Sequence, residues 1–159
     1  MKTVHLISEK TLKEFSLLDD NLTMEYITPV LQFVQDWKME NILGSDLYQD
    51  VKNKVEAGNV SDDYKNLLYH IKFVLLWGIQ SEIQIPLNYK FRNQGYVNTQ
   101  NADGSNVDLE DIKYTKAYYE KICAQYERFL IKFLDENRIK FPLYKSCASD
   151  TTFQNPITL

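Results

Sequence analysis

Apolar and polar residues alternate with helical spacing through residues 29–48. The apolar residues recur at three- to five-residue steps, which predicts an amphipathic helix with one buried face. Gly44 is expected to end this helix, because glycine readily adopts the left-handed backbone of a C-terminal cap. Ser45 or Asp46 is expected to cap a second helix that starts at residues 47–48. The expected buried face comprises Val30, Leu31, Phe33, Val34, Trp37, Ile42 and Leu43, and the expected solvent-facing side comprises Gln32, Gln35, Asp36, Lys38 and Glu40.

The next two predicted helices follow the same logic. Residues 46–57 have helical spacing and are followed by a stop signal at Gly58. Residues 64–85 carry apolar side chains almost all round, which is typical of the central helix of a bundle. Pro86 is expected to end that helix, because the residue before a proline disfavours helical backbone angles.

The longest predicted helix covers residues 108–137. Ser105 and Asp108 resemble a capping box at its start. Its expected core face comprises Leu109, Ile112, Tyr119, Ile122, Tyr126, Phe129, Leu130 and Phe133.

Shorter signals complete the fold prediction. Ser8 is expected to cap a short helix that ends near residue 17, and residues 3–7 before it form either a strand or an extended arm. Residues 89–92 and 96–99, separated by residues 93–95, fit a small β-hairpin, and residues 145–159 lack a helical period. We therefore predict a mostly α protein: a single-domain helical bundle of about four to five helices with a small β-hairpin and extended terminal arms. The predicted division is a helical domain at 1–145 and an extended tail at 146–159.

Composition narrows the classes of function. Contents of 44 % hydrophobic and 25 % charged residues are ordinary for a globular chain. A net charge of −4 argues against a surface dominated by DNA or membrane binding. No apolar run approaches the roughly 18 residues of a membrane span, and no secretory signal is recognised, so we expect synthesis in the cytoplasm and no membrane partner.

The strongest hint of metal chemistry is a partial match to a calcium-binding loop over residues 99–110. Thr99 stands where the loop expects aspartate, and Asn106 stands where it expects an apolar residue. A solvated turn followed by a helix cap is therefore the favoured interpretation, and we expect no metal and no cofactor. The matching positions are Asn101, Asp103, Gly104 and Glu110.

Catalytic patterns are weak. His70 lies in an apolar segment and is expected to be structural, and Cys123 is expected to be a small buried hydrophobe. Paired carboxylates precede helix starts, where capping and the helix dipole favour anions. We find no phosphate-binding loop, nucleophile elbow or dinucleotide motif, and we therefore do not expect an enzyme.

Four tyrosines of the last predicted helix fall into two groups. Tyr119 and Tyr126 share the expected core face and are expected to pack. Tyr114 and Tyr118 lie one turn apart on another side. They form either a protein–protein contact, where tyrosine is enriched, or ordinary amphipathic surface.

These segments together resemble a known family. A helix with Gln-Asp in mid-course, followed by Ile-Leu-Gly-x-x-Leu-Tyr at residues 42–48, is similar to the start of head–tail connector proteins of tailed bacteriophages, particularly those of Bacteroides-type hosts. The resemblance continues through the apolar helix at 69–86, the polar excursion at 93–97 and the closing Phe-Pro-Leu-Tyr at 141–144. It covers roughly residues 5 to 145.

The resemblance implies a structural role in the virion neck, with assembly in the host cytoplasm. The implied protein forms a dodecameric ring beneath the portal protein, contacts the next tail or neck ring protein, and lets DNA pass without sequence-specific binding. Loops and terminal arms would contact neighbouring subunits. The resulting interface candidates are Tyr89, Phe91, Arg92, Tyr96, Tyr114, Tyr118, Phe153 and Ile157.

A second hypothesis stays open. A small cytoplasmic helical domain that binds or regulates another protein would share these patterns. It would form a stable monomer or dimer that does not depend on a portal protein.

Overall fold

Helices make up most of the computed structural model, which describes residues 3–18, 22–92, 95–98 and 108–145. The predicted mostly helical class is therefore confirmed. In chain order the elements are α1 (Glu9–Phe15), α2 (Met24–Leu43), α3 (Ser45–Glu56), α4 (Asp62–Glu82), α5 (Gln84–Asn88), β1 (Tyr89–Arg92), β2 (Gly95–Asn98) and α6 (Leu109–Glu136).

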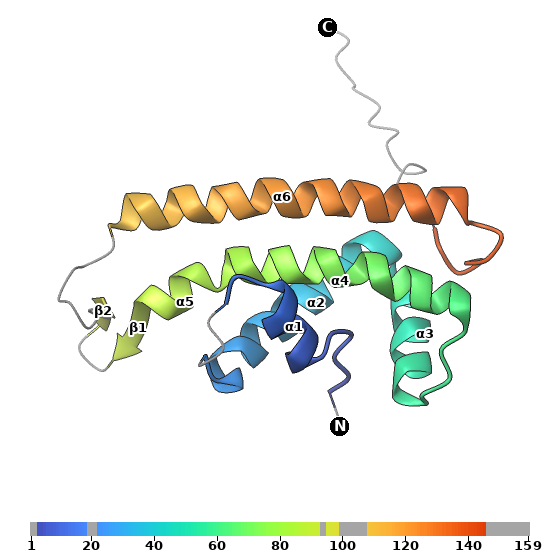
Figure 1. The fold of residues 1–159 in the computed structure, drawn as a ribbon, viewed down its shortest axis with the longest axis horizontal. Helices are drawn as coiled ribbons and strands as arrows, with labels where there is room; N and C mark the ends of the chain where they lie inside the picture. The colour runs from blue at the N-terminus through green and yellow to red at the C-terminus, as the bar shows by residue number, and fades with distance from the viewer. Residues whose placement is uncertain (1–2, 19–21, 93–94, 99–107, 146–159) are drawn as a thin grey trace, which may run out of the picture.

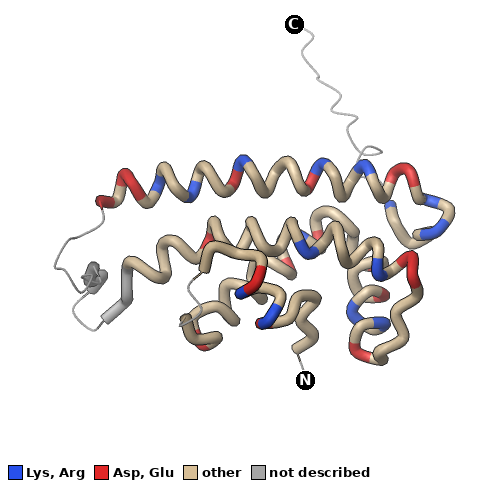
Figure 2. The backbone as a smooth tube through the Cα atoms, in the orientation of Figure 1, with Lys and Arg blue, Asp and Glu red and all other residues tan. Residues whose placement is uncertain are grey.

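Helix α4 lies at the centre of the fold, as its apolar character predicts. Figure 1 shows α6 along one long side of α4 and α1 and α3 on the opposite side, while α2 crosses α4 and its Lys38 pairs with Glu127 of α6 at 2.7 Å. Figure 2 shows few charged residues in the middle of α4, which agrees with contacts on both sides. Its fully buried residues are Leu67, Ile71, Val74, Leu75 and Ile79.

Aromatic rings form much of the contact between α4 and α6. Phe73 stacks on Tyr126 with ring centroids 5.1 Å apart, and Trp77 stacks on Tyr119 at 5.9 Å. The predicted packing role of Tyr119 and Tyr126 is therefore confirmed. Stacked pairs contribute about 0.5–1.5 kcal/mol beyond the area they bury, so this seam fixes α6 strongly against α4.

The break between α2 and α3 occurs at Gly44, as predicted, where φ is +74°. The expected start of α3 at residues 47–48 is wrong, because α3 begins at Ser45 with Gly44 itself as its N-cap. No side chain caps this end, and the Ser45 hydroxyl instead donates a hydrogen bond to the carboxylate of Glu40 on α2. One glycine therefore serves both helix ends.

The predicted buried face of α2 is partly wrong. Phe33 and Trp37 are 55 % and 43 % exposed, whereas Gln35, which we placed on the solvent-facing side, is completely buried. The true core face follows Leu31, Gln35 and Met39 at four-residue steps. A polar residue thus occupies a core position because its amide finds partners there.

Pro86 does not end the helical structure as predicted. Helix α4 ends at Glu82, and Pro86 then lies in the first turn of α5. The first backbone N–H groups of a helix have no intrahelical acceptor, so a proline there loses no hydrogen bond.

The start of α6 differs from the predicted capping box. Asp108 is the N-cap itself and accepts a hydrogen bond from the Glu110 N–H at 3.4 Å, while Ser105 lies outside the described residues. Leu109 and Phe129, predicted for the core face, are 44 % and 55 % exposed. Both side chains are thus only partly covered, and the ring of Phe129 packs edge-on against Tyr126 with centroids 5.9 Å apart.

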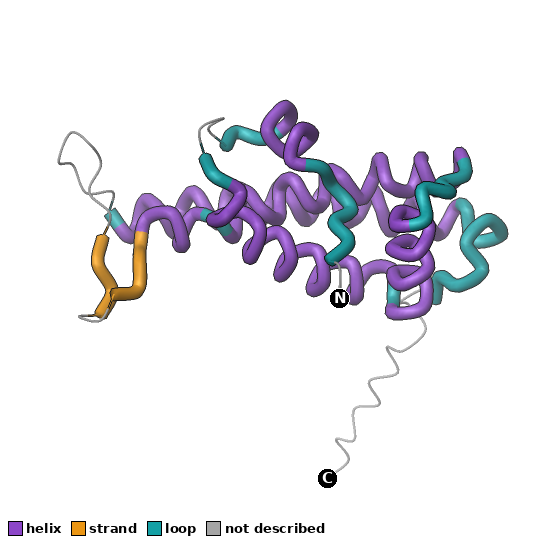
Figure 3. The backbone as a smooth tube through the Cα atoms, turned by 90° about the horizontal axis from the view of Figure 1, so that it is seen from below, coloured by secondary structure: helices purple, strands orange, loops and turns teal. Residues whose placement is uncertain are grey.

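Between α5 and α6, β1 and β2 pair antiparallel, with Phe91 opposite Tyr96 and Tyr89 opposite Asn98. Figure 3 shows these strands beyond one end of the helices. We call this the hairpin end of the molecule, and we call the opposite end, where α3 lies, the α3 end.

Gly78 allows the close approach of α4 and α2. A Cβ atom at this position would lie 2.7 Å from Cγ1 of the fully buried Val34. We expect Gly78→Ala to lower the free energy of unfolding by about 1–3 kcal/mol, because overpacking outweighs the roughly 1 kcal/mol by which alanine favours a helix. Chemical denaturation would measure the change.

The matched control is Gly78→Ala combined with Val34→Ala, which removes the clashing methyl groups. The second substitution should cost less in the Gly78→Ala background than in the wild type. A Gly78→Ala protein more stable than the wild type would show that α2 and α4 are not in close contact here.

Candidate interaction surfaces

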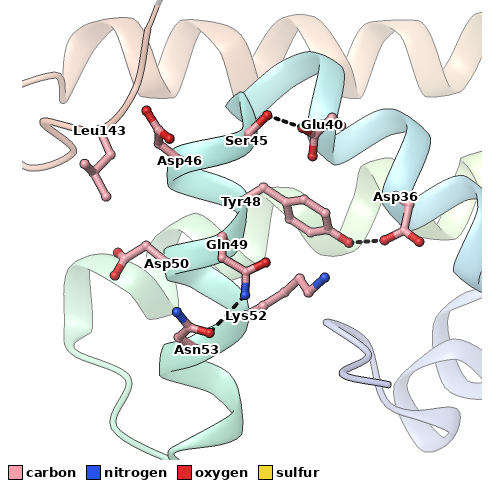
Figure 4. Close-up of a pocket in the computed structure, with 10 residues that line it drawn as sticks. All are labelled: Asp36, Glu40, Ser45, Asp46, Tyr48, Gln49, Asp50, Lys52, Asn53 and Leu143. Atoms are coloured by element: carbon pink, nitrogen blue, oxygen red, sulfur yellow. Dashed lines mark hydrogen bonds between the residues drawn. The ribbon is translucent and has the colours of Figure 1, made fainter. Parts of the chain in front are cut away.

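An open groove of about 950 Å³ lies along α2 and α3 (Figure 4). Four carboxylates and one lysine line it, so we call it the acidic groove. Two of the carboxylates already have cationic partners: Asp46 pairs with Lys145 at 2.8 Å and Asp50 with Lys54 at 3.1 Å. The lining residues are Asp36, Glu40, Ser45, Asp46, Tyr48, Gln49, Asp50, Lys52, Asn53 and Leu143.

Tyr48 and Asp36 form the polar centre of this groove. The Tyr48 hydroxyl donates to Asp36 Oδ1 at 2.6 Å. Burial and the Asp36 carboxylate raise the pKa of Tyr48, so its phenol stays protonated at neutral pH. Burial opposes ionisation of Asp36, but hydrogen bonds from Tyr48 and Gln32 outweigh it and hold the pKa below its ordinary value. A neutral donor on an ionised acceptor is a structural pair with no proton to exchange near pH 7.

The buried amide of Gln35 joins this pair to the N-terminal segment. Its Nε2 donates to the Tyr48 hydroxyl at 3.1 Å and to the Val4 carbonyl at 2.9 Å. Its Oε1 accepts from the Leu6 N–H at 2.7 Å. Residues 3–7 are therefore an extended arm and not a strand, and a side chain provides the partners that a strand would provide.

A second groove, of about 360 Å³, joins the start of α2 to α5, and we call it the apolar groove. Phe33 lines it and stacks on the neighbouring Trp37 with centroids 5.5 Å apart. Large apolar side chains exposed together are typical of interaction sites. The lining residues are Pro29, Val30, Phe33, Glu82, Ile85 and Pro86.

The outer side of α6 carries a third surface, which we call the α6 stripe. Its exposed residues recur at alternating four- and three-residue steps on the side away from α4. Between Ile112 and Lys132 the exposed charged residues of α6 are four cations and one acid, Glu120. The stripe itself is therefore locally basic, and exposed acids of α6 flank it at Glu110, Asp111, Asp135 and Glu136. The stripe comprises Tyr114, Tyr118, Lys121, Gln125, Arg128 and Lys132.

The candidate reactive groups have structural surroundings. His70 stacks on Phe133 with centroids 4.4 Å apart, and burial lowers the pKa of His70. Burial, then Glu127, raises the pKa of Cys123 to about 12, so the thiol is not a nucleophile near neutral pH. Its Sγ donates to the Val74 carbonyl at 3.5 Å, away from the His70–Phe133 stack.

The predicted interface residues are distributed as follows. Tyr114 and Tyr118 are 77 % and 55 % exposed, which leaves them available for contacts. Four others lie on the paired strands: Tyr89, Phe91, Arg92 and Tyr96. Phe153, Ile157 and most of the calcium-like loop lie outside the described residues.

In the described part of the chain, no group of three or more His, Cys, Asp or Glu side chains is placed to hold a metal ion. None of the described helices is long and apolar enough to cross a membrane.

Sequence reasoning missed Gln35 and the apolar groove. The four-residue steps from Leu31 through Gln35 to Met39 were a usable signal for Gln35. The groove had no sequence signal, because it brings together residues 29–33 and 82–86.

Comparison with known protein families identifies a match. A family model described as "Family of unknown function (DUF6712)" matches residues 39–154, which is more than half of the chain. No curated protein and no solved structure matches this chain.

The Gln35 amide is testable by substitution. We expect Gln35→Leu, which keeps the side-chain size, to lower the free energy of unfolding by about 1–3 kcal/mol, because partly buried backbone groups of the arm lose their partners. Hydrogen exchange at the Leu6 amide should accelerate. Gln49→Leu is the control, since Gln49 is exposed and its amide donates to Asn53 within α3; unchanged Leu6 exchange in Gln35→Leu would contradict the assignment.

Tyr48 gives a prediction for alkaline pH. Because its pKa is raised above the ordinary 10.0, the folded state holds the phenolic proton more tightly than the unfolded state does. This contribution is complete below pH 10 and is lost as pH rises above it. From pH 10 to about pH 11, Tyr48→Phe should therefore lose less unfolding free energy than the wild type.

Urea denaturation at both pH values would measure the difference. Tyr114→Phe, which changes an exposed tyrosine, should keep the wild-type loss. Equal losses in Tyr48→Phe and the wild type would contradict the buried Tyr48–Asp36 pair.

Proposed function

We propose that this chain, which belongs to the DUF6712 family of unknown function, is a non-enzymatic structural protein of a tailed-phage virion. In this proposal it forms a ring between the portal protein and the tail. The ring extends the DNA channel and provides the surface to which the tail attaches. It is assembled in the host cytoplasm and resides at the head–tail junction.

One observation carries this proposal: two chemically different exposed surfaces lie on two sides of α4. The α6 stripe is aromatic and basic, while the side formed by α2, α3 and α5 carries the apolar and acidic grooves. Identical subunits in a cyclic ring contact each other through two different, complementary surfaces. A two-fold dimer needs only one self-complementary surface, so this asymmetry favours a ring.

The resemblance of the sequence to head–tail connector proteins supports the same role. The segment that carries it is the junction at which α2 ends, Gly44 turns the chain, and α3 begins. This junction also holds the Tyr48–Asp36 pair and, through Gln35, the N-terminal arm. The resemblance therefore concerns the residues that set the shape of the subunit.

In this proposal, the hairpin β1–β2 and the tail at 146–159 contact the portal protein and the next ring. Strands with a free edge bind neighbours by adding main-chain hydrogen bonds. Tyr89, Phe91, Arg92 and Tyr96 lie on the hairpin, and Phe153 and Ile157 lie in the tail.

A second candidate is a small helical domain that binds or regulates another protein. The apolar groove favours it, because an exposed groove lined by proline, valine, phenylalanine and isoleucine suits an amphipathic partner helix. Such a domain would act as a monomer or dimer without a portal protein.

Native mass spectrometry of the full chain mixed with the portal protein of its source genome separates these candidates. We expect a complex in which many copies of the chain bind one portal ring. A portal protein from an unrelated phage is the control and should remain unbound. A monomer or dimer that ignores its own portal protein would overturn the connector proposal in favour of the binding domain.

A further inference from the structure

We infer that the α6 stripe of one copy docks on the apolar and acidic grooves of the next copy, with both copies pointing in the same direction. The inference rests on the proposed ring and names the contact that would build it. The partner of each surface is thus a second copy of this chain. The argument for this partner is the order of apolar and charged residues along the two surfaces.

The apolar parts of both surfaces lie at the hairpin end. Glu82 lines the apolar groove and binds Lys116 of α6 at 2.9 Å, which places this part of α6 beside α5. Tyr114 and Tyr118 flank Lys116 in sequence and are exposed on the outer side of α6. When two copies point in the same direction, the two tyrosines of one copy therefore lie at the same height along the long axis as the apolar groove of the next copy.

The charged parts of both surfaces lie at the α3 end. Lys140, just beyond α6, binds Asp63 at the start of α4 at 2.9 Å, so α6 ends where α4 begins. The basic half of the stripe, Lys121, Arg128 and Lys132, leads towards this end, where Lys132 pairs with Glu136 of its own helix at 3.8 Å and Lys121 and Arg128 supply the cations for docking. The acidic groove lies along α3 (Figure 4), and Figure 1 places α3 at this end.

The charges of the two surfaces are complementary at this level. Glu40 is exposed on the rim of the acidic groove, where it accepts a hydrogen bond from the neutral Ser45 hydroxyl, and this contact does not neutralise its negative charge. Cations of a neighbouring stripe would be attracted to this groove, whereas two stripes facing each other would bring like charges together. The charge pattern therefore selects contact between different surfaces.

Docking in this way is a head-to-tail contact. It leaves one unused stripe and one unused pair of grooves on every growing assembly, so it stops only when a ring closes. The positions of α6 and α3 on opposite sides of α4 allow both surfaces of one copy to be occupied at once. Lysines and arginines spaced along α6 are visible in Figure 2.

A charge-swap experiment tests this contact. Lys121→Glu with Arg128→Glu reverses the charges of the stripe, and Glu40→Lys with Gln49→Lys places two lysines in the groove and cancels its net negative charge; all four residues are exposed. Each double variant alone should need about tenfold or more protein for half-assembly, measured by sedimentation with and without the portal protein. An equal mixture of the two should recover assembly, because the glutamates of the altered stripe then meet the lysines of the altered groove, and the unaltered stripe meets the unaltered groove.

The control is Lys10→Glu with Lys65→Glu, which changes the net charge as much as the stripe variant does. Both lysines are exposed in ion pairs within their own helices, and assembly of this variant should stay at the wild-type level. Thermal melting monitored by circular dichroism identifies any variant that fails to fold. A photo-crosslinker in place of Phe33 gives a readout without charge reversal and should capture α6 of another copy.

The outcomes separate this inference from the proposed function. Portal-bound assemblies that ignore both charge reversals, or a Phe33 crosslink to any other segment, would overturn the inference and leave the connector proposal intact. Charge-dependent assembly that ignores the portal protein would support the contact and overturn the connector role. A wild-type chain that never self-associates would overturn both.

Discussion

Close packing of α4 against helices on two sides is the constraint on which the other features depend. Without a side chain at Gly78, α2 can approach α4 so closely that Val34 fills the space. One residue earlier, Trp77 begins the aromatic contacts with α6. Trp77 and Gly78, which are neighbours on α4, thus fix the positions of α6 and α2. The grooves and the α6 stripe keep their relative positions because of this central contact.

Local signals predicted the helices well, because each signal acts within a few residues. Gly58 is an example: its φ is +66°, and the N–H groups of Gly58 and Asn59 bond to carbonyls in the last turn of α3. That is the Schellman arrangement, which glycine permits. Pro86 shows the limit of such signals, since the same residue suits a helix's first turn as well as the position after its end.

The burial of α2 could not be predicted as reliably, because its partners are distant in sequence. Helical spacing identified Phe33 and Trp37 as apolar, but it did not show that α2 turns Leu31, Gln35 and Met39 inward. Gln35 becomes a core residue only because Val4 and Leu6 supply hydrogen-bonding partners. Of the candidate surfaces, the α6 stripe follows from spacing on one helix, and the apolar groove requires knowledge of how α2 and α5 meet.

The length of α6 has a mechanical consequence. It is one uninterrupted helix of 28 residues, so it extends about 42 Å. Its aromatic contacts with α4 run along much of that length, so the two packed helices resist bending more than α6 would alone. A load applied at the hairpin end is therefore transmitted to the α3 end through hydrogen-bonded helix and stacked rings. The subunit is therefore stiff along its long axis, because α6 has no loop between Leu109 and Glu136 that could bend under compression.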